Sequence, residues 1–226
     1  MGAKEAVPTL RADVFTQSML LTAVIGGGAV LAGVWWLGAA SPTWVLITFA
    51  AIAVGVFPLA GAHRTNDFLS APQWTLVASA LLMYTGLAVD VIYNNVLTIA
   101  ELCLTPGTVV MSFETWLRHV EAMPMMHAGM LAGGTVAFFI VRDGTRRAGR
   151  RTLYAQVCFH TICLVVMLFG MSSGIGVFRL VAQLTGLQWN GMAMLGGMIT
   201  GMVWIMWLLV SVGNWIFDRR ECPVGT

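Results

Sequence analysis

Residues 192–217 read MAMLGGMITGMVWIMWLLVSVGNWIF, a stretch without a single charged side chain. Its length matches the roughly 20 helical residues, at about 1.5 Å of rise each, that cross the hydrocarbon core of a bilayer. Strands of a membrane β-barrel alternate apolar and polar residues over about ten positions, whereas this stretch is continuously apolar and rich in Gly and Met. It therefore predicts a transmembrane helix.

The rest of the chain repeats this pattern. The 226 residues are 58% hydrophobic and only 10% charged, which is too apolar for a protein whose surface faces water. No connecting segment is long enough to separate two folding units. We therefore expect an all-α integral membrane protein with a single domain over residues 1–226 and about six transmembrane helices, at approximately 15–37, 43–62, 74–100, 122–141, 153–180 and 192–217.

The basic residues predict the orientation of this bundle, because Lys and Arg are retained on the cytoplasmic side of short loops. With the N-terminus inside, ten of the 12 basic residues are cytoplasmic and only Arg118 and Arg179 lie outside. We therefore expect both termini and the basic loop 142–151 (RDGTRRAGRR) in the cytoplasm, in a multi-pass protein of a prokaryotic-type plasma (inner) membrane. The loop suits anionic lipid headgroups, and we expect no nucleic acid among the partners.

The connection between the third and fourth spans predicts a short helix on the outer surface. Ser112 can cap this helix, Glu114 lies in its first turn, and Trp116 suits the membrane interface. Pro124 lies where the chain would then turn into the membrane.

Small residues at a spacing of four mark the last three spans. Glycines at this spacing let helix backbones approach closely within a bilayer. The pairs are Gly129/Gly133, Gly170/Gly174 and Gly197/Gly201. We expect the fourth, fifth and sixth spans to form a compact unit.

Polar side chains follow one face of the predicted third span. The face comprises Asp90, Asn94, Thr98 and Glu101. Their intervals of four, four and three confine them to roughly 80° of the helix circumference. A charge inside a bilayer is costly unless it is paired, and this span contains no Lys or Arg to neutralise Asp90. The face suits a cation or proton path, or hard metal ligands; a polar seam satisfied by neighbouring helices is the alternative.

The start of the fourth span gathers imidazole and thioether side chains. One side of the helix holds His119, Met123, Met126 and Met130, with His127 at its edge. Imidazole and thioether together bind Cu(I), and imidazole also binds Cu(II), zinc and haem iron. The cluster would lie at the outer end of the bundle, where an exported or imported ion would be met. Packing by Met is the alternative, and a kink at Pro124 could turn His119 away.

The fifth and sixth spans predict deeper soft ligands. In the fifth span, one face of about 80° holds Gln156, His160, Cys163, Met167 and Met171. In the sixth span, steps of four connect Met194, Met198, Met202 and Met206. A ladder of Met could pass a soft ion between sites, and a packing seam of Met and Gly is the alternative interpretation.

The first functional hypothesis is copper handling, either as a conduit or as a metal-holding subunit of a membrane enzyme complex. The outer site would comprise His119, Met123, Met126, His127 and Met130. The deeper site would comprise His160, Cys163 and Met167, and Asp90 and Asn94 could complete either site.

Two alternatives stay open. A haem b subunit of a redox complex would use His127 and His160 as axial ligands from facing helices. A proton-coupled permease or structural subunit would use Asp90 and Glu101, with the Met residues serving only to pack. The sequence lacks a Walker loop and a Gly-x-Ser-x-Gly motif, so it supports neither nucleotide hydrolysis nor the usual serine nucleophile.

The expected surroundings of the chain are the lipid bilayer and other membrane proteins. No sizeable water-facing domain is present in the sequence, so partner subunits or a homo-oligomer are expected. Whether the chain is itself an enzyme stays open. It could instead be a non-catalytic or metal-binding subunit of a membrane oxidoreductase complex.

Overall fold

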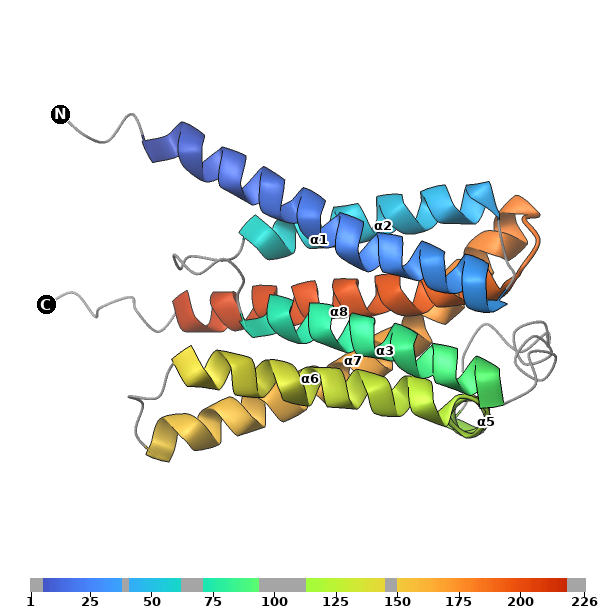
Figure 1. The fold of residues 1–226 in the computed structure, drawn as a ribbon. Helices are drawn as coiled ribbons and strands as arrows, with labels where there is room; N and C mark the ends of the chain where they lie inside the picture. The colour runs from blue at the N-terminus through green and yellow to red at the C-terminus, as the bar shows by residue number, and fades with distance from the viewer. Residues whose placement is uncertain (1–5, 38–40, 62–70, 94–112, 145–149, 219–226) are drawn as a thin grey trace, which may run out of the picture.

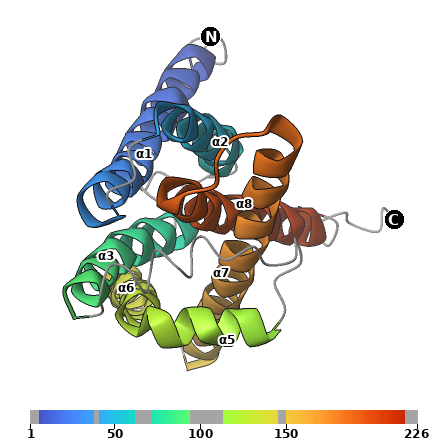
Figure 2. The same ribbon diagram turned by 90° about the vertical axis from the view of Figure 1, so that its right-hand side faces the viewer.

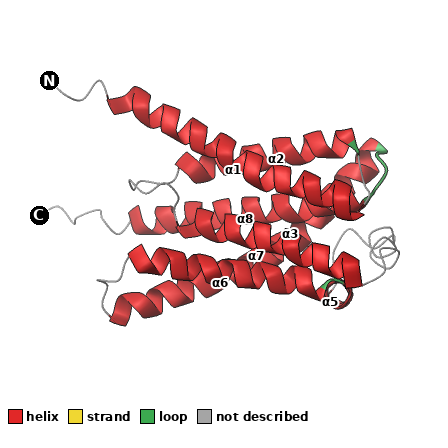
Figure 3. Cartoon of the chain, viewed as in Figure 1, coloured by secondary structure: helices red, strands yellow, loops and turns green. Residues whose placement is uncertain are grey.

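The computed structural model describes residues 6–37, 41–61, 71–93, 113–144 and 150–218. Within these ranges the regular structure is entirely helical, with seven helices and no strand (Figures 1 and 3). The helices are α1 (Ala6–Leu37), α2 (Pro42–Gly61), α3 (Ala71–Tyr93), α5 (Phe113–Ala122), α6 (Pro124–Gly144), α7 (Arg150–Thr185) and α8 (Gly191–Asp218). The all-α prediction is confirmed over this part of the chain.

Local sequence signals begin and end these helices. Pro42 opens α2, where a backbone N–H is not needed. Gly186 follows the last residue of α7 with φ of 71°, the left-handed conformation that favours glycine after a helix. Asn190 caps α8, because its Oδ1 accepts a hydrogen bond of 2.9 Å from the N–H of Ala193. The turn between α7 and α8 is thus specified by its own residues.

Five of the described helices are long and apolar enough to cross a membrane. Their candidate spans are Val14–Leu37, Pro42–Ala60, Pro72–Tyr93, Val157–Thr185 and Gly191–Val212. The chain therefore has the architecture of a multi-pass helical membrane protein. Figure 1 shows α6 running beside α3, and α1 beginning at the end of the bundle where α8 finishes. Residues 94–100 of the predicted third span and 145–149 of the basic loop lie outside the described residues.

Glycines bring α6 against α3, backbone to backbone. A Cβ on Gly129 would collide with the carbonyl of Leu82, and a Cβ on Gly133 would collide with that of Ala78. Gly86 of α3 makes the reciprocal approach to α6, at the carbonyl of Met125. Small residues allow this close approach, in which dispersion holds membrane helices together.

A second pair of the same kind joins α7 and α8. Gly170 approaches the carbonyl of Gly201, and Gly174 approaches the carbonyl of Gly197. The predicted packing of the fifth and sixth spans is therefore found. The α6 glycines instead face α3, and α6 approaches α7 closely at few points. The expectation that all three glycine-rich spans form one unit is wrong, because a glycine pair requires close approach without specifying the partner helix.

We expect Gly133→Ala to lower the thermal stability of the purified protein. The new methyl group has no space against the Ala78 carbonyl, and overpacking of this kind costs about 1–3 kcal/mol. Gly27→Ala is the matched control, since a Cβ at Gly27 would meet nothing within 4 Å. Thermal unfolding in detergent should show a lower midpoint for Gly133→Ala and an unchanged midpoint for Gly27→Ala. Equal midpoints would mean that the α3–α6 contact is looser than described.

A sulfur-rich core connects the two glycine-packed pairs. Figure 2 shows α8 near the middle of the bundle, with α1 and α2 on one side and α3, α6 and α7 on others. One continuous buried cluster contains sulfur atoms from α3, α6, α7, α8 and the α5–α6 junction. These belong to Met83, Met123, Met126, Met130, Cys163, Met167, Met171, Met194, Met198, Met202 and Met206. The Met stripes predicted on separate helices thus meet in one place.

Candidate metal centre

The junction between α5 and α6 forms the centre of the candidate site. Helix α5 lies across the end of the bundle, and the chain then turns into α6 (Figure 2). Met123 between the two helices is not helical, and Pro124 begins α6. The turn keeps its hydrogen bonds, because the Met123 N–H donates to the His119 carbonyl at 3.0 Å and the His127 N–H donates to the Met123 carbonyl at 3.4 Å. A short helix at this place was predicted, although Ser112, its expected cap, lies outside the described residues.

Two imidazole rings face each other across this junction. The centroids of the His119 and His127 rings are 6.3 Å apart, with an angle of 89° between the ring planes. Each side chain is 6% exposed. The bend at Pro124 therefore does not turn His119 away, and the two predicted ligands lie together.

The ring nitrogens of the two residues differ in their surroundings. Nδ1 of His127 lies 2.8 Å from the Met123 carbonyl, which can only accept, so this nitrogen carries the proton. The neutral ring then has its lone pair on Nε2. Nε2 of His119 is buried and has no hydrogen-bond partner among the described residues. Burial lowers the pKa of His119 to about 4, with repulsion from His127 as a second cause, so His119 is neutral at pH 7.

Three thioethers complete the predicted outer set. Met123, Met126 and Met130 are fully buried and belong to the core cluster, whereas Met125 is half exposed. All five residues that the sequence grouped here are buried at or near the α5–α6 junction, and the two imidazole rings approach each other. Within the described ranges, no three His, Cys, Asp or Glu side chains gather in one place, so a metal centre here would depend on Met sulfur.

Asp90 acts on this site through the backbone. Its Oδ1 accepts a hydrogen bond of 3.0 Å from the Met125 N–H, and its Oδ2 accepts one of 2.7 Å from the Met126 N–H. The first N–H groups of a helix lack partners within the helix, and Met123 cannot cap them. Asp90, 1% exposed, thus caps α6 from α3. The helix terminus supplies the positive partner that no Lys or Arg provides in this span.

The other three members of the polar face predicted on the third span, Asn94, Thr98 and Glu101, lie outside the described residues. The sequence did not indicate Met83, which is fully buried on α3. Met83, Gly86 and Asp90 follow each other at intervals of three and four, so this face of α3 meets α6 and the sulfur core. This spacing of three and four residues was the sequence signal that could have identified Met83.

The deeper predicted set lies on α7, further along the bundle. Cys163 and Met167 are buried in the core cluster, and the His160 ring packs on Phe138 of α6 with 5.1 Å between centroids. Nε2 of His160 is buried without a hydrogen-bond partner in the described ranges. Within the described residues, His160 is thus a second imidazole site that the protein itself does not satisfy.

His127 and His160 lie at different depths in the bundle. Phe138, which contacts His160, follows His127 by eleven residues in α6, or about 16 Å along the helix axis. Axial ligands must bind opposite faces of one iron, so this separation disfavours the haem alternative.

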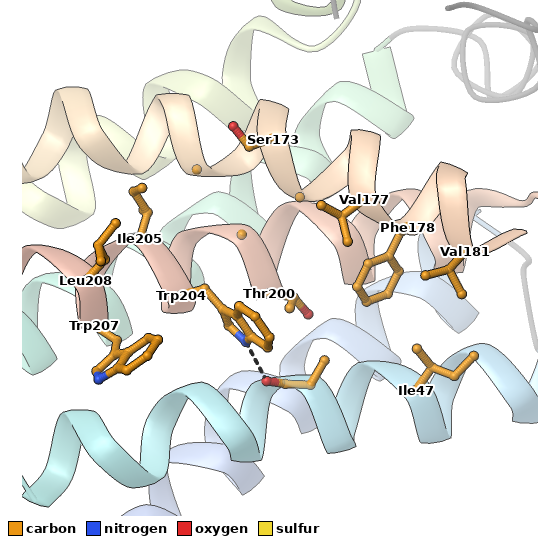
Figure 4. Close-up of a pocket in the computed structure, with 14 residues that line it drawn as sticks. Ile47, Ser173, Val177, Phe178, Val181, Thr200, Trp204, Ile205, Trp207 and Leu208 are labelled. Carbon is orange, nitrogen blue, oxygen red and sulfur yellow. Dashed lines mark hydrogen bonds between the residues drawn. The ribbon is translucent and has the colours of Figure 1, made fainter. Parts of the chain in front are cut away.

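An apolar groove lies elsewhere, between α2, α7 and α8 (Figure 4). Its volume is about 440 Å³, and its described lining has no charged side chain. Trp204 crosses from α8 to α2, where its Nε1–H donates to the Ala51 carbonyl at 2.8 Å. None of the His and Met residues of the candidate centre lines this groove. It is therefore a separate feature, suited to hydrocarbon.

No protein family model, curated protein or solved structure matches the chain. The functional inference therefore rests on the donor atoms themselves. Those atoms are the unpartnered Nε2 of His119, the neighbouring ring of His127 and the buried thioethers close to them in the sequence, at the end of the bundle where α5 meets α6.

Proposed function

We propose that the protein handles copper in a prokaryotic-type plasma (inner) membrane, as a conduit or as the copper-holding subunit of an oxidoreductase complex. One observation carries the proposal: the His119 and His127 rings lie against each other, the buried Nε2 of His119 has no hydrogen-bond partner among the described residues, and three buried thioethers belong to the same stretch of chain. Imidazole with thioether is the donor set that copper in its reduced state prefers.

The arrangement of the helices supports a topology with six spans, in which α6 is the fourth. The start of α1, the end of α6, the start of α7 and the end of α8 lie at one end of the bundle (Figure 1). Arg11, Arg142, Arg150 and Arg151 belong to these helix ends, which supports a cytoplasmic location under the positive-inside rule. The His119/His127 pair at the opposite end then faces the outside, where an ion can enter or leave.

Further soft donors extend from the outer pair into the bundle and support the conduit form. α7 runs antiparallel to α6. The direction from Met171 back to His160 along α7 is therefore the same as the direction from the start of α6 toward Phe138. The side chains that would pass an ion along this direction are Met130, Met171, Met167, Cys163 and His160. On α7, His160, Cys163, Met167 and Met171 follow each other at intervals of about one turn, and the His160–Phe138 contact lies about 16 Å along α6 from His127.

The first experiment is elemental analysis of the purified protein, with a visible spectrum of the same detergent sample. Near-stoichiometric copper without a haem band supports the proposal. A colourless protein that takes up no metal would contradict it and would favour a structural subunit, in which Asp90 only caps α6 and the sulfur atoms only pack.

A pair of neighbouring variants tests whether sulfur is needed. We expect Met126→Leu to weaken copper binding at least about tenfold, because it keeps the volume but removes a ligand. Met125→Leu is the matched control, since Met125 is adjacent in sequence but half exposed. Competition with a chromophoric copper chelator measures both affinities. Equal affinities would show that the thioether of Met126 is not a ligand.

The proposal also concerns the partners of the bundle. The described part of α7 exposes a row of large apolar side chains, including Ile162, Val165 and Phe169. Such a surface suits lipid and also suits another membrane subunit or a second copy of the chain. A complex that co-purifies with copper would support the subunit form over the conduit.

A further inference from the structure

The donor atoms around the His119/His127 pair carry no charge. The candidate ligands are two imidazoles, which bind metal in their neutral form, and the thioethers of Met123, Met126 and Met130. Sites for Zn(II) and Cu(II) draw on imidazole, thiolate and carboxylate groups, whereas thioethers select Cu(I). In the described part of the chain no third His, Cys, Asp or Glu joins these two imidazoles.

One negative charge lies behind this donor set. Among the acidic residues whose side chains the structure describes, only Asp90 is buried. Both of its oxygens are directed to N–H groups at the start of α6, so the carboxylate faces the backbone. A single positive charge on a bound ion would balance Asp90 and leave the buried region neutral.

The charge of the ion decides how costly its burial is. The electrostatic free energy of removing an ion from water grows with the square of its charge, so a divalent ion meets roughly four times the penalty of a monovalent one. Negatively charged ligands normally offset that penalty, and the ligands present here are neutral. A divalent ion would also leave one positive charge unbalanced next to the α6 terminus, which is itself positive.

On the basis of the proposed copper function, we infer that the site binds a monovalent soft cation, Cu(I) or its analogue Ag(I), in preference to Cu(II) and Zn(II). The inference assigns Asp90 two tasks, which are to cap α6 and to supply the balancing charge. It also requires that copper reach this end of the bundle in the reduced state.

The test titrates four ions separately into the full-length protein in detergent. Cu(I) is kept reduced under anaerobic conditions with a chromophoric chelator as competitor, and Ag(I), Cu(II) and Zn(II) are measured by calorimetry. We expect Cu(I) and Ag(I) to bind with one equivalent at the outer site, at least about 100-fold more tightly than the divalent ions. Titration of the His119→Ala/His127→Ala double variant with the same ions shows how much of the binding of each ion depends on this pair.

The outcomes separate this inference from the function on which it rests. Zn(II) or Cu(II) binding as tight as that of Cu(I), and lost in the double variant, would overturn monovalent selectivity while leaving a metal site in place. Failure of all four ions to bind would overturn the proposed function as well. Monovalent binding that persists in the double variant would overturn the placement of the selective site at His119 and His127.

Discussion

The double substitution His119→Ala/His127→Ala is expected to remove nearly all copper from the purified protein while the bundle stays folded. Both imidazoles lie at the α5–α6 junction, and neither side chain is among the atoms that the glycines of the α3–α6 and α7–α8 contacts approach. Loss of the buried, unpartnered Nε2 of His119 also removes an unsatisfied polar atom, which offsets part of the cavity that the substitution creates. Copper per protein by mass spectrometry is the measurement.

The matched control is Leu117→Ala, which truncates an exposed side chain of the same helix α5. It should keep the copper content of the parent. Circular dichroism and gel filtration of both variants should show the helical content and size of the parent. Full copper occupancy in a folded double variant would remove these two residues from any metal site.

The second large effect is expected at Asp90. Asp90→Ala leaves the N–H groups of Met125 and Met126 buried without an acceptor, and each such group costs about 1–3 kcal/mol. We expect a clearly lower unfolding midpoint together with weaker copper binding, because the first turn of α6 carries Met126 and His127. Thermal unfolding and chelator competition on the same preparation measure the two effects.

Asp90→Asn separates the two tasks of this residue. Its amide oxygen can still accept from one N–H group, so stability should fall less than in Asp90→Ala, while the balancing charge is lost completely. Copper binding should therefore fall in Asp90→Asn by more than its stability loss accounts for. X-ray absorption on the remaining bound copper should show unchanged sulfur and nitrogen neighbours, since Asp90 positions the ligands rather than joining them. A direct carboxylate oxygen in the parent spectrum would contradict this role.

Continuous apolar runs were sufficient to predict the helices, because a bilayer demands length and apolarity from each span separately. Most described helix ends fall within a few residues of the predicted spans. The sequence also placed His119 near His127 and the three thioethers along the chain, and the structure shows the approach of the two imidazole rings. That approach depends on the bend at Met123 and Pro124 as well as on helical spacing.

Contacts between helices were not predictable in the same way. The charge of Asp90 is stabilised by a helix terminus 35 residues further along the chain, and no local pattern indicates that pairing. The same reasoning applies to the α6 glycines, whose partner is α3, and to His160, whose neighbour is Phe138 rather than His127. Each of these depends on which helices pack together and at what depth, and a single sequence contains little information on either.

The bend at Met123 and Pro124 has a consequence for how an ion would be captured. In an unbroken helix, His119 and His127 would be about 12 Å apart along the axis, whereas the bend brings their rings to 6.3 Å. The folded backbone alone thus sets the two imidazoles near one another, before any ion arrives. Folding has therefore already met the entropic cost of gathering the ligands, and binding requires only small side-chain adjustments. A preorganised pair of this kind suits an ion that must be taken up and released many times.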